Sequence, residues 1–184
     1  KDYDLYLFDF DNTLFDSKPR VEAVLRAVLA LKGETYDPSR FSEYLNKDLD
    51  VLYGGRNNEE TEMMTALTES ILASMQDAAV PFPEVGSVLR ELKRRGKRIG
   101  IVSGSSRDEI HKYLRANGLD DIPEIVVGWY ETERHKPYPD PLALAFSFFD
   151  VPKERTVYVG DSANDTGASK AFGVDCVIVN RRNG

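Results

Sequence analysis

The sequence contains few of the residues on which disulfides, soft-metal sites and nucleic-acid binding depend. Of its 184 residues, one is cysteine and two are histidine, which excludes an internal disulfide and disfavours a zinc site. The 24 lysines and arginines are outnumbered by 31 acidic residues, so bulk charge does not favour nucleic acid or an anionic membrane as a partner. No apolar run approaches the roughly 20 residues that a membrane-spanning helix needs.

The residues that are present are typical of a folded globular protein. Hydrophobic residues make up 41% of the chain and charged residues 30%, which suits one core or a core with a small insert. The single cysteine, Cys176, lies in the apolar run 174–179 and is expected to be a small buried core residue. A lone cysteine and the lack of an apparent signal peptide favour the cytoplasm.

Short apolar strands alternate with helical patterns through most of the chain. This alternation predicts an α/β fold, with a Rossmann-like, doubly wound parallel sheet. Between 16 and 80 the apolar residues recur only at helical spacing, and no strand is expected there. We therefore predict an α/β core formed by 1–15 and 81–184, with 16–80 inserted after the first strand as a separate helical segment. The predicted strands are 5–8, 99–102, 125–127, 157–159 and 177–179.

Polar residues collect where the predicted strands end. Asp9 and Asp11 follow the first strand, Ser103 follows the second, and Asp161 with Asp165 follows the fourth. Ligands of open α/β sheets bind outside the carboxyl ends of the strands, so these groups are expected to converge. Four carboxylates together would repel one another, and oxygen ligands favour Mg²⁺ as the cation that relieves this. Lys136, in the loop after the third strand, adds a positive charge.

Each pattern by itself has a simpler explanation. Asp9 and Asp11 could begin a solvated turn, and Asp161 could be a helix N-cap. Ser103 alone is most often a turn residue, and Lys136 alone is usually a solvated surface charge. Only their combination and order favour a catalytic site.

Four motifs in order resemble those of the haloacid dehalogenase (HAD) superfamily, and together they cover the whole predicted core. The helical insert resembles the cap of the branch that contains phosphoglycolate phosphatase and β-phosphoglucomutase. The motifs are Asp9-Phe10-Asp11-Asn12-Thr13, Ser103, Lys136 before Pro-x-Pro, and Gly160-Asp161-Ser162-Ala163-Asn164-Asp165.

The resemblance implies roles for these residues. Asp9 would be the nucleophile that forms an aspartyl-phosphate, and Asp11 would protonate the leaving oxygen and then activate water. It also implies a Mg²⁺ site formed by Asp9, the Asp11 backbone carbonyl, Asp161 and Asp165. The residues implied to hold the phosphate are Asn12, Ser103, Gly104 and Lys136.

The activity that the resemblance implies is Mg²⁺-dependent hydrolysis of a small phosphomonoester, so the expected partner is a small phosphorylated metabolite. A dehalogenase is disfavoured because Asp11 supplies an acid–base group. A phosphosugar mutase stays open, although the insert has no histidine and Val21 stands where β-phosphoglucomutases carry one. A phosphonatase would need a lysine in the insert, and none there has a distinctive setting. A non-catalytic phosphate-binding module is the alternative outside the enzymes.

The insert is expected to act as a lid that selects the substrate. Its connections near 15–18 and 80–83 are the predicted hinges. Arg20 near the start of the insert, together with Gly55 and Arg56 in its glycine loop, is predicted from position to contact the substrate. No motif in the insert specifies which phosphomonoester is bound, and no pattern specifies an oligomeric state.

Overall fold

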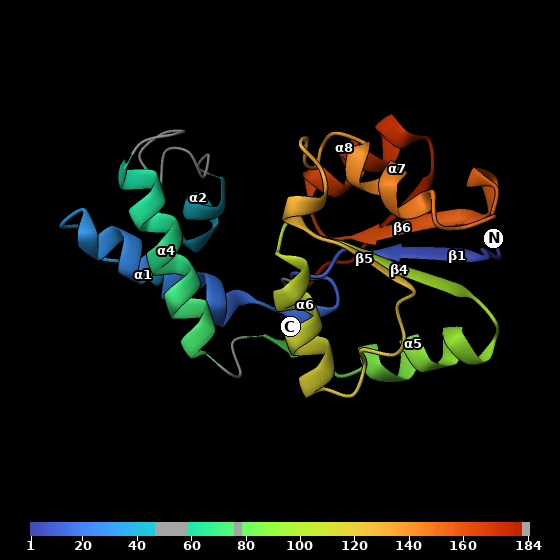
Figure 1. Ribbon diagram of the computed structural model, residues 1–184, viewed down its shortest axis with the longest axis horizontal. Coiled ribbons are helices and arrows are strands. Elements are labelled where there is room, and N and C mark those ends of the chain that lie inside the picture. Colours follow the sequence, from blue (N-terminus) through green and yellow to red (C-terminus); the bar gives the residue numbers. More distant parts are fainter. Residues whose placement is uncertain (47–58, 76–78, 182–184) are drawn as a thin grey trace. The chain divides into compact units, whose positions relative to one another are not determined.

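The computed structural model describes residues 1–46, 59–75 and 79–181 (Figure 1). It divides the chain into two compact units, which we call the α/β unit (Lys1–Asp16 with Val80–Gly184) and the helical unit (Ser17–Ala79). The predicted domain boundaries differ from these by one residue at each junction. That the helical unit works as a cap stays a prediction.

The α/β unit is built on a five-stranded sheet in the order β5-β4-β1-β6-β7. All four strand pairs are parallel, and β1 pairs with β4 and β6 on its two sides. The carboxyl ends of the strands therefore share one edge of the sheet, which confirms the predicted fold class. The strands are β1 (Leu5–Phe8), β4 (Arg98–Val102), β5 (Ile125–Val127), β6 (Thr156–Gly160) and β7 (Asp175–Ile178).

Helices cover both faces of this sheet (Figure 1). One face carries α5 (Val85–Arg94) and α6 (Arg107–Ala116), and the other carries α7 (Asp140–Phe146) and α8 (Ala163–Phe172). Two short 3-10 helices, η2 (Trp129–Glu131) and η3 (Lys153–Arg155), lie in the connections. The core between the sheet and α7 and α8 consists of Leu5, Leu7, Val102, Val127, Leu142, Ala145, Phe149, Tyr158 and Ala168.

The expectation that 16–80 contains no strand is wrong at both ends of the segment. Strands β2 (Phe15–Asp16) and β3 (Val80–Pro81) pair in antiparallel fashion, and the amide of Phe82 extends the pairing by donating to Leu14 O at 3.0 Å. Two residues are too few to show the alternation that identifies a strand in a sequence. This pair joins the end of the first segment of the α/β unit, residues 1–16, to the beginning of its second segment, residues 80–184.

The last strand, β7, lies at an edge of the sheet and is more exposed than predicted. Cys176 is half-buried rather than buried, and the neighbouring Val177 and Ile178 are 46% and 47% exposed. An edge strand has a neighbour on one side only, so an apolar sequence there does not ensure burial.

The helical unit contains α1 (Lys18–Leu31), η1 (Pro38–Arg40), α2 (Phe41–Asn46) and α4 (Glu59–Ser74). Helix α1 has proline in its first turn, where the amide has no intrahelical partner, and it is followed by Gly33 at φ 73°. Leu25, Leu29, Tyr36 and Tyr44 form the buried cluster of this unit. No helix within the described ranges is long and apolar enough to cross a bilayer.

Candidate active site

The chain turns sharply after β1 and separates the two acids that follow it. Asn12 has φ 57°, a conformation that asparagine tolerates better than most residues. Its amide donates to Phe15 O at 2.7 Å, and the amide of Leu14 donates to Phe10 O at 3.0 Å. Asp9 is 5% exposed and Asp11 is half-buried, so the two carboxylates have different surroundings from the start.

Lys136 joins the first acid to the fourth motif. Its Nζ donates to Asp9 Oδ1 at 2.7 Å and to Asp165 Oδ1 at 2.6 Å, with Tyr158 Oη 2.9 Å away. The side chain of Lys136 is only 11% exposed. A buried ammonium between two buried carboxylates compensates part of the large cost of burying either charge alone.

Tyr158 is a site residue that the sequence reasoning missed. Its hydroxyl is fully buried, contacts Lys136, and lies 3.1 Å from both Val102 O and Asp165 Oδ1. The available signal was a tyrosine inside the apolar strand 156–160, since a buried tyrosine hydroxyl usually needs a polar partner.

Burial and charge shift the pKa values of this cluster in opposite directions. Burial raises the pKa of Asp9 to about 7; the Lys136 ammonium opposes this rise, while the charges of Asp165 and Asp11 add to it. Burial also acts to lower the pKa of Lys136, but the surrounding Asp9, Tyr158 and Asp165 hold that pKa well above its ordinary value. The cluster therefore favours a charged lysine and makes the ionised form of Asp9 costly unless another cation binds.

Asp165 organises the loop that follows β6. Its Oδ2 accepts hydrogen bonds from the Asp161 and Ser162 amides at 3.1 and 3.0 Å, and from Ser162 Oγ at 2.6 Å. Although burial acts to raise the pKa of Asp165, Lys136 and the Ser162 donors hold it below its ordinary value. Gly160 is required here, because a Cβ at that position would lie 2.4 Å from Asp165 Cγ.

Three carboxylates of the site could hold a metal ion. Asp9, Asp161 and Asp165 each offer an oxygen, and these oxygens all lie within 4.8 Å of one another. A set of carboxylate oxygens suits a hard divalent cation. Asp165 already accepts bonds on both oxygens, whereas Asp161 is half-buried at the start of α8. Asp9 likewise accepts on both oxygens, from Lys136 and Thr13, so the donor set as a whole, Asp9, Asp161 and Asp165, fits the cation.

Asp11 faces the loop after β4 rather than the carboxylate cluster. Its Oδ2 accepts hydrogen bonds from Ser103 Oγ at 3.2 Å and from Ser105 Oγ at 2.5 Å. Ser103 Oγ in turn accepts from the Ser105 amide at 3.1 Å. Ser105 was not among the predicted site residues, although it stands two positions after Ser103. A Cβ on the adjacent Gly104 would meet no atom within 4 Å, so packing alone does not require glycine there.

The structure brings the predicted residues of the α/β unit to one edge of the sheet. The predicted substrate contacts belong to the insert. Arg20 lies in α1 of the helical unit, where it is only 7% exposed. Gly55 and Arg56 lie outside the described residues. The roles predicted for these three residues stay predictions.

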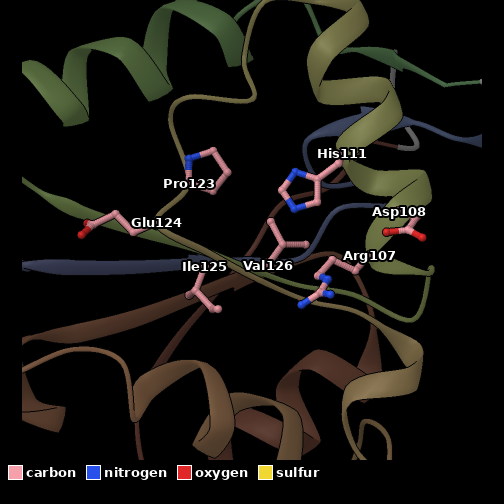
Figure 2. Close-up of a pocket in the computed structure, with 7 residues that line it drawn as sticks. All are labelled: Arg107, Asp108, His111, Pro123, Glu124, Ile125 and Val126. Atoms are coloured by element: carbon pink, nitrogen blue, oxygen red, sulfur yellow. The ribbon is translucent and has the colours of Figure 1, made fainter.

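Two surface grooves of the α/β unit lie apart from the predicted site residues. The one drawn in Figure 2 has a volume of about 380 Å³, and α6 and β5 contribute to its lining. The other has a volume of about 520 Å³ and is lined by residues of α5 and its end. Neither groove is lined by a carboxylate of the cluster or by Lys136. Convergent charge, rather than cavity size, therefore identifies the candidate active site.

Comparison with known proteins assigns the family. The model of the haloacid dehalogenase-like hydrolases matches residues 6–179, so the chain belongs to this family. A phosphoglycolate phosphatase of Colwellia psychrerythraea is 30% identical over 187 residues, covering 95% of this chain and 83% of the relative. The pyrophosphatase PpaX of Halalkalibacterium halodurans is 28% identical over 179 residues, covering 94% of this chain and 81% of the relative.

Solved structures agree with this assignment. A Bacteroides fragilis protein described as a haloacid dehalogenase-like hydrolase superposes with a TM-score of 0.85 at 32% identity, covering 95% of this chain and 86% of the other. CbbY of Rhodobacter sphaeroides, solved in complex with phosphate, gives a TM-score of 0.81 at 23% identity, covering 99% and 90%. At that identity CbbY supports the fold alone.

Proposed function

We propose that the protein is a Mg²⁺-dependent phosphatase that hydrolyses a small phosphorylated metabolite through an aspartyl-phosphate on Asp9. The observation that carries the proposal is the contact of Lys136 Nζ with Asp9 at 2.7 Å and Asp165 at 2.6 Å, beside a set of carboxylates that fits a hard cation. Lys136 fixes the Asp9 carboxylate in position for attack on phosphorus. The lysine and the cation also offset the negative charge of the phosphate that Asp9 would attack.

Asp9 and Asp11 divide the chemistry. In the first step an Asp9 oxygen forms a bond to phosphorus, while the bond from phosphorus to the leaving oxygen breaks and Asp11 supplies its proton. In the second step Asp11 takes a proton from water, which attacks phosphorus and releases Asp9 and inorganic phosphate. The separate surroundings of the two acids support this division, because Asp9 contacts Lys136 and Asp11 contacts the serines of the β4 loop.

The remaining residues bind and orient the phosphate. Ser103, Gly104 and Asn12 lie on the loops that follow β4 and β1, and Lys136 supplies the positive charge. Asp9, Asp161 and Asp165 would hold Mg²⁺ together with the Asp11 carbonyl, and the hydrogen bonds that Asp165 accepts also keep the Asp161 loop in place. When bound, the ion offsets the repulsion between the Asp9 carboxylate and the phosphate.

The names of two relatives support two substrate chemistries that are worth testing. One named relative is a phosphoglycolate phosphatase, whose substrate by name is a phosphomonoester, and another is a pyrophosphatase, whose substrate by name is a phosphoanhydride. We propose that the helical unit acts as a cap that selects between such substrates. Arg20, Gly55 and Arg56 are the residues proposed to contact the substrate. The cytoplasm is the proposed location.

The test is a panel of glycolyl, sugar and nucleotide phosphates together with pyrophosphate, assayed for phosphate release with and without Mg²⁺. Wild-type protein is expected to turn over at least one member only with Mg²⁺, and Asp9→Asn is expected to lower kcat by at least about 10³-fold. Asp2→Asn, which changes an exposed acid, is the matched control. Retained turnover in a folded Asp9→Asn variant, checked by circular dichroism, would contradict the nucleophile assignment.

A further inference from the structure

Arg181, three residues after β7, reaches back to the loop that carries the two catalytic acids. One terminal nitrogen donates to Thr13 O at 2.8 Å, and the other forms an ion pair with Glu84. The guanidinium carbon lies 4.0 Å from the centroid of the Phe82 ring. One side chain thus contacts the segment before β2 and the segment after β3, far apart in sequence.

Thr13 connects this contact to the candidate nucleophile. The threonine is 1% exposed, and its Oγ1 donates to Asp9 Oδ2 at 3.1 Å. Arg181 donates a hydrogen bond to the backbone carbonyl of the same threonine. Fixing that carbonyl limits rotation of the Thr13 backbone and so restricts where its hydroxyl points.

We propose that Arg181 is a positioning residue, which fixes the loop 10–15 so that Thr13 orients the Asp9 carboxylate for attack on phosphorus. The effect of Arg181 on the reaction rests on the proposed phosphatase function, whereas its effect on the conformation of the loop 10–15 is independent of that function. The role follows from one guanidinium that bridges Thr13, Glu84 and Phe82, and it needs no bound ligand.

Arginine suits this role better than lysine for a geometric reason. Its two terminal nitrogens are fixed in one plane, so they reach the Thr13 carbonyl and the Glu84 carboxylate at the same time, while the plane lies near the Phe82 ring. A lysine at 181 would keep the charge but offers one nitrogen, so it would satisfy the two acceptors less well. A methionine would keep much of the apolar stem and remove both bonds.

The variants follow from these contacts. Arg181→Met removes the bridge, Arg181→Lys keeps its charge, and Glu84→Gln weakens the ion pair while leaving Arg181 and Thr13 in place. Arg95→Met is the matched control, because Arg95 pairs with Glu91 on the surface of α5 and lies away from the site. All variants are made in the full chain.

Two readouts separate positioning from simple structural support. Hydrogen exchange of the Leu14 and Phe15 amides, which both donate to Phe10 O, reports on the loop without any substrate. We expect exchange to be roughly tenfold faster in Arg181→Met, with smaller changes in Glu84→Gln and Arg181→Lys and none in Arg95→Met. We also expect kcat to fall roughly tenfold in Arg181→Met while KM changes less, with partial rescue by lysine.

The outcomes are distinguishable. Unchanged exchange of these amides in Arg181→Met would overturn the proposal. Faster exchange with an unchanged kcat would overturn the link to Asp9 and leave Arg181 as a purely structural contact. If the wild-type protein released phosphate from no member of the panel, the proposed phosphatase function would fail, and exchange would still decide whether Arg181 holds the loop.

Discussion

The α/β unit and the helical unit fill their interiors with different kinds of group. The α/β unit buries Asp9 and Asp165 around the ammonium of Lys136. The buried cluster of the helical unit consists of leucine and tyrosine side chains, and the hydroxyl of Tyr36 bonds Glu22 at 2.9 Å. Arg20 is a buried charged residue of this unit, but it is not a member of that cluster. Buried charges are costly even when paired, whereas packed apolar groups stabilise. The comparison indicates that the α/β unit gathers buried charges of opposite sign in one cluster, whereas the helical unit depends mainly on packed leucine and tyrosine side chains.

The largest expected effect follows from removing the shared cation of the α/β unit. Lys136→Met leaves Asp9 and Asp165 buried without their ammonium partner, so we expect a loss of about 3–5 kcal/mol in the free energy of unfolding. Phosphate release is expected to fall by at least about 10³-fold. Urea unfolding and the phosphate assay measure the two effects.

The control for this change is Lys153→Met. Lys153 Nζ donates to Phe172 O on the exposed surface, and its loss is expected to cost about 1 kcal/mol or less. Near-normal turnover in a folded Lys136→Met protein would show that the buried charges do not serve the reaction.

The next effect is stabilisation by Mg²⁺, which should act on the α/β unit alone. At about 100 times its dissociation constant, the ion is expected to add about 2.7 kcal/mol to the free energy of unfolding. Because burial raises the pKa of Asp9 to about 7, the ion competes with a proton at lower pH, so the stabilisation should be larger at pH 8 than at pH 6. Thermal unfolding with added Mg²⁺ tests this.

Asp161→Asn and Asp150→Asn form a matched pair for this measurement. Asp161 belongs to the carboxylate cluster, whereas Asp150 is an exposed acid at the end of the α7 region. We expect the first change to remove most of the Mg²⁺ effect and the second to leave it intact. Equal Mg²⁺ stabilisation in both variants would place the ion somewhere other than the cluster.

A smaller effect is expected from the hydroxyl of Tyr158. Tyr158→Phe removes the contacts to Lys136, Val102 O and Asp165 while keeping the ring, so we expect a loss of about 1–3 kcal/mol in stability and roughly tenfold in kcat. Tyr113→Phe, in another fully buried ring of the same unit, is the control. If both variants behave alike, Tyr158 contributes packing only.

The smallest effect concerns the helical unit. Burial, and then the hydrogen bond to Glu22, raise the pKa of Tyr36 to about 12. Because the neutral tyrosine is favoured in the folded state, its contribution is fully present below pH 10 and is lost as the pH rises toward 12. Tyr36→Phe should cost about 1 kcal/mol and leave phosphate release unchanged. Absorbance at 295 nm follows the titration, and a normal tyrosine pKa in the wild type would contradict this assignment.

Much of the α/β unit was predictable because its signals are local. Apolar runs gave the strands of the sheet to within a residue or two, and the cap of α6 is also local, because Ser106 accepts from the Glu109 amide at 3.3 Å. The acids were identified because they stand directly at strand ends. Burial of Cys176 was predicted wrongly, since an apolar run does not show whether its strand lies at the centre or the edge of a sheet.

The sequence by itself determined the alternation of strands and helices, the order of the four motifs, and hence the family. Only the tertiary structure showed that Tyr158 and Ser105 join the site, that Asp11 turns away from the carboxylate cluster, and that Arg181 returns to Thr13. The physical reason is that these contacts connect residues dozens of positions apart or depend on a single turn at Asn12. Local propensity places residues on strands, whereas the sheet order decides which strand ends meet.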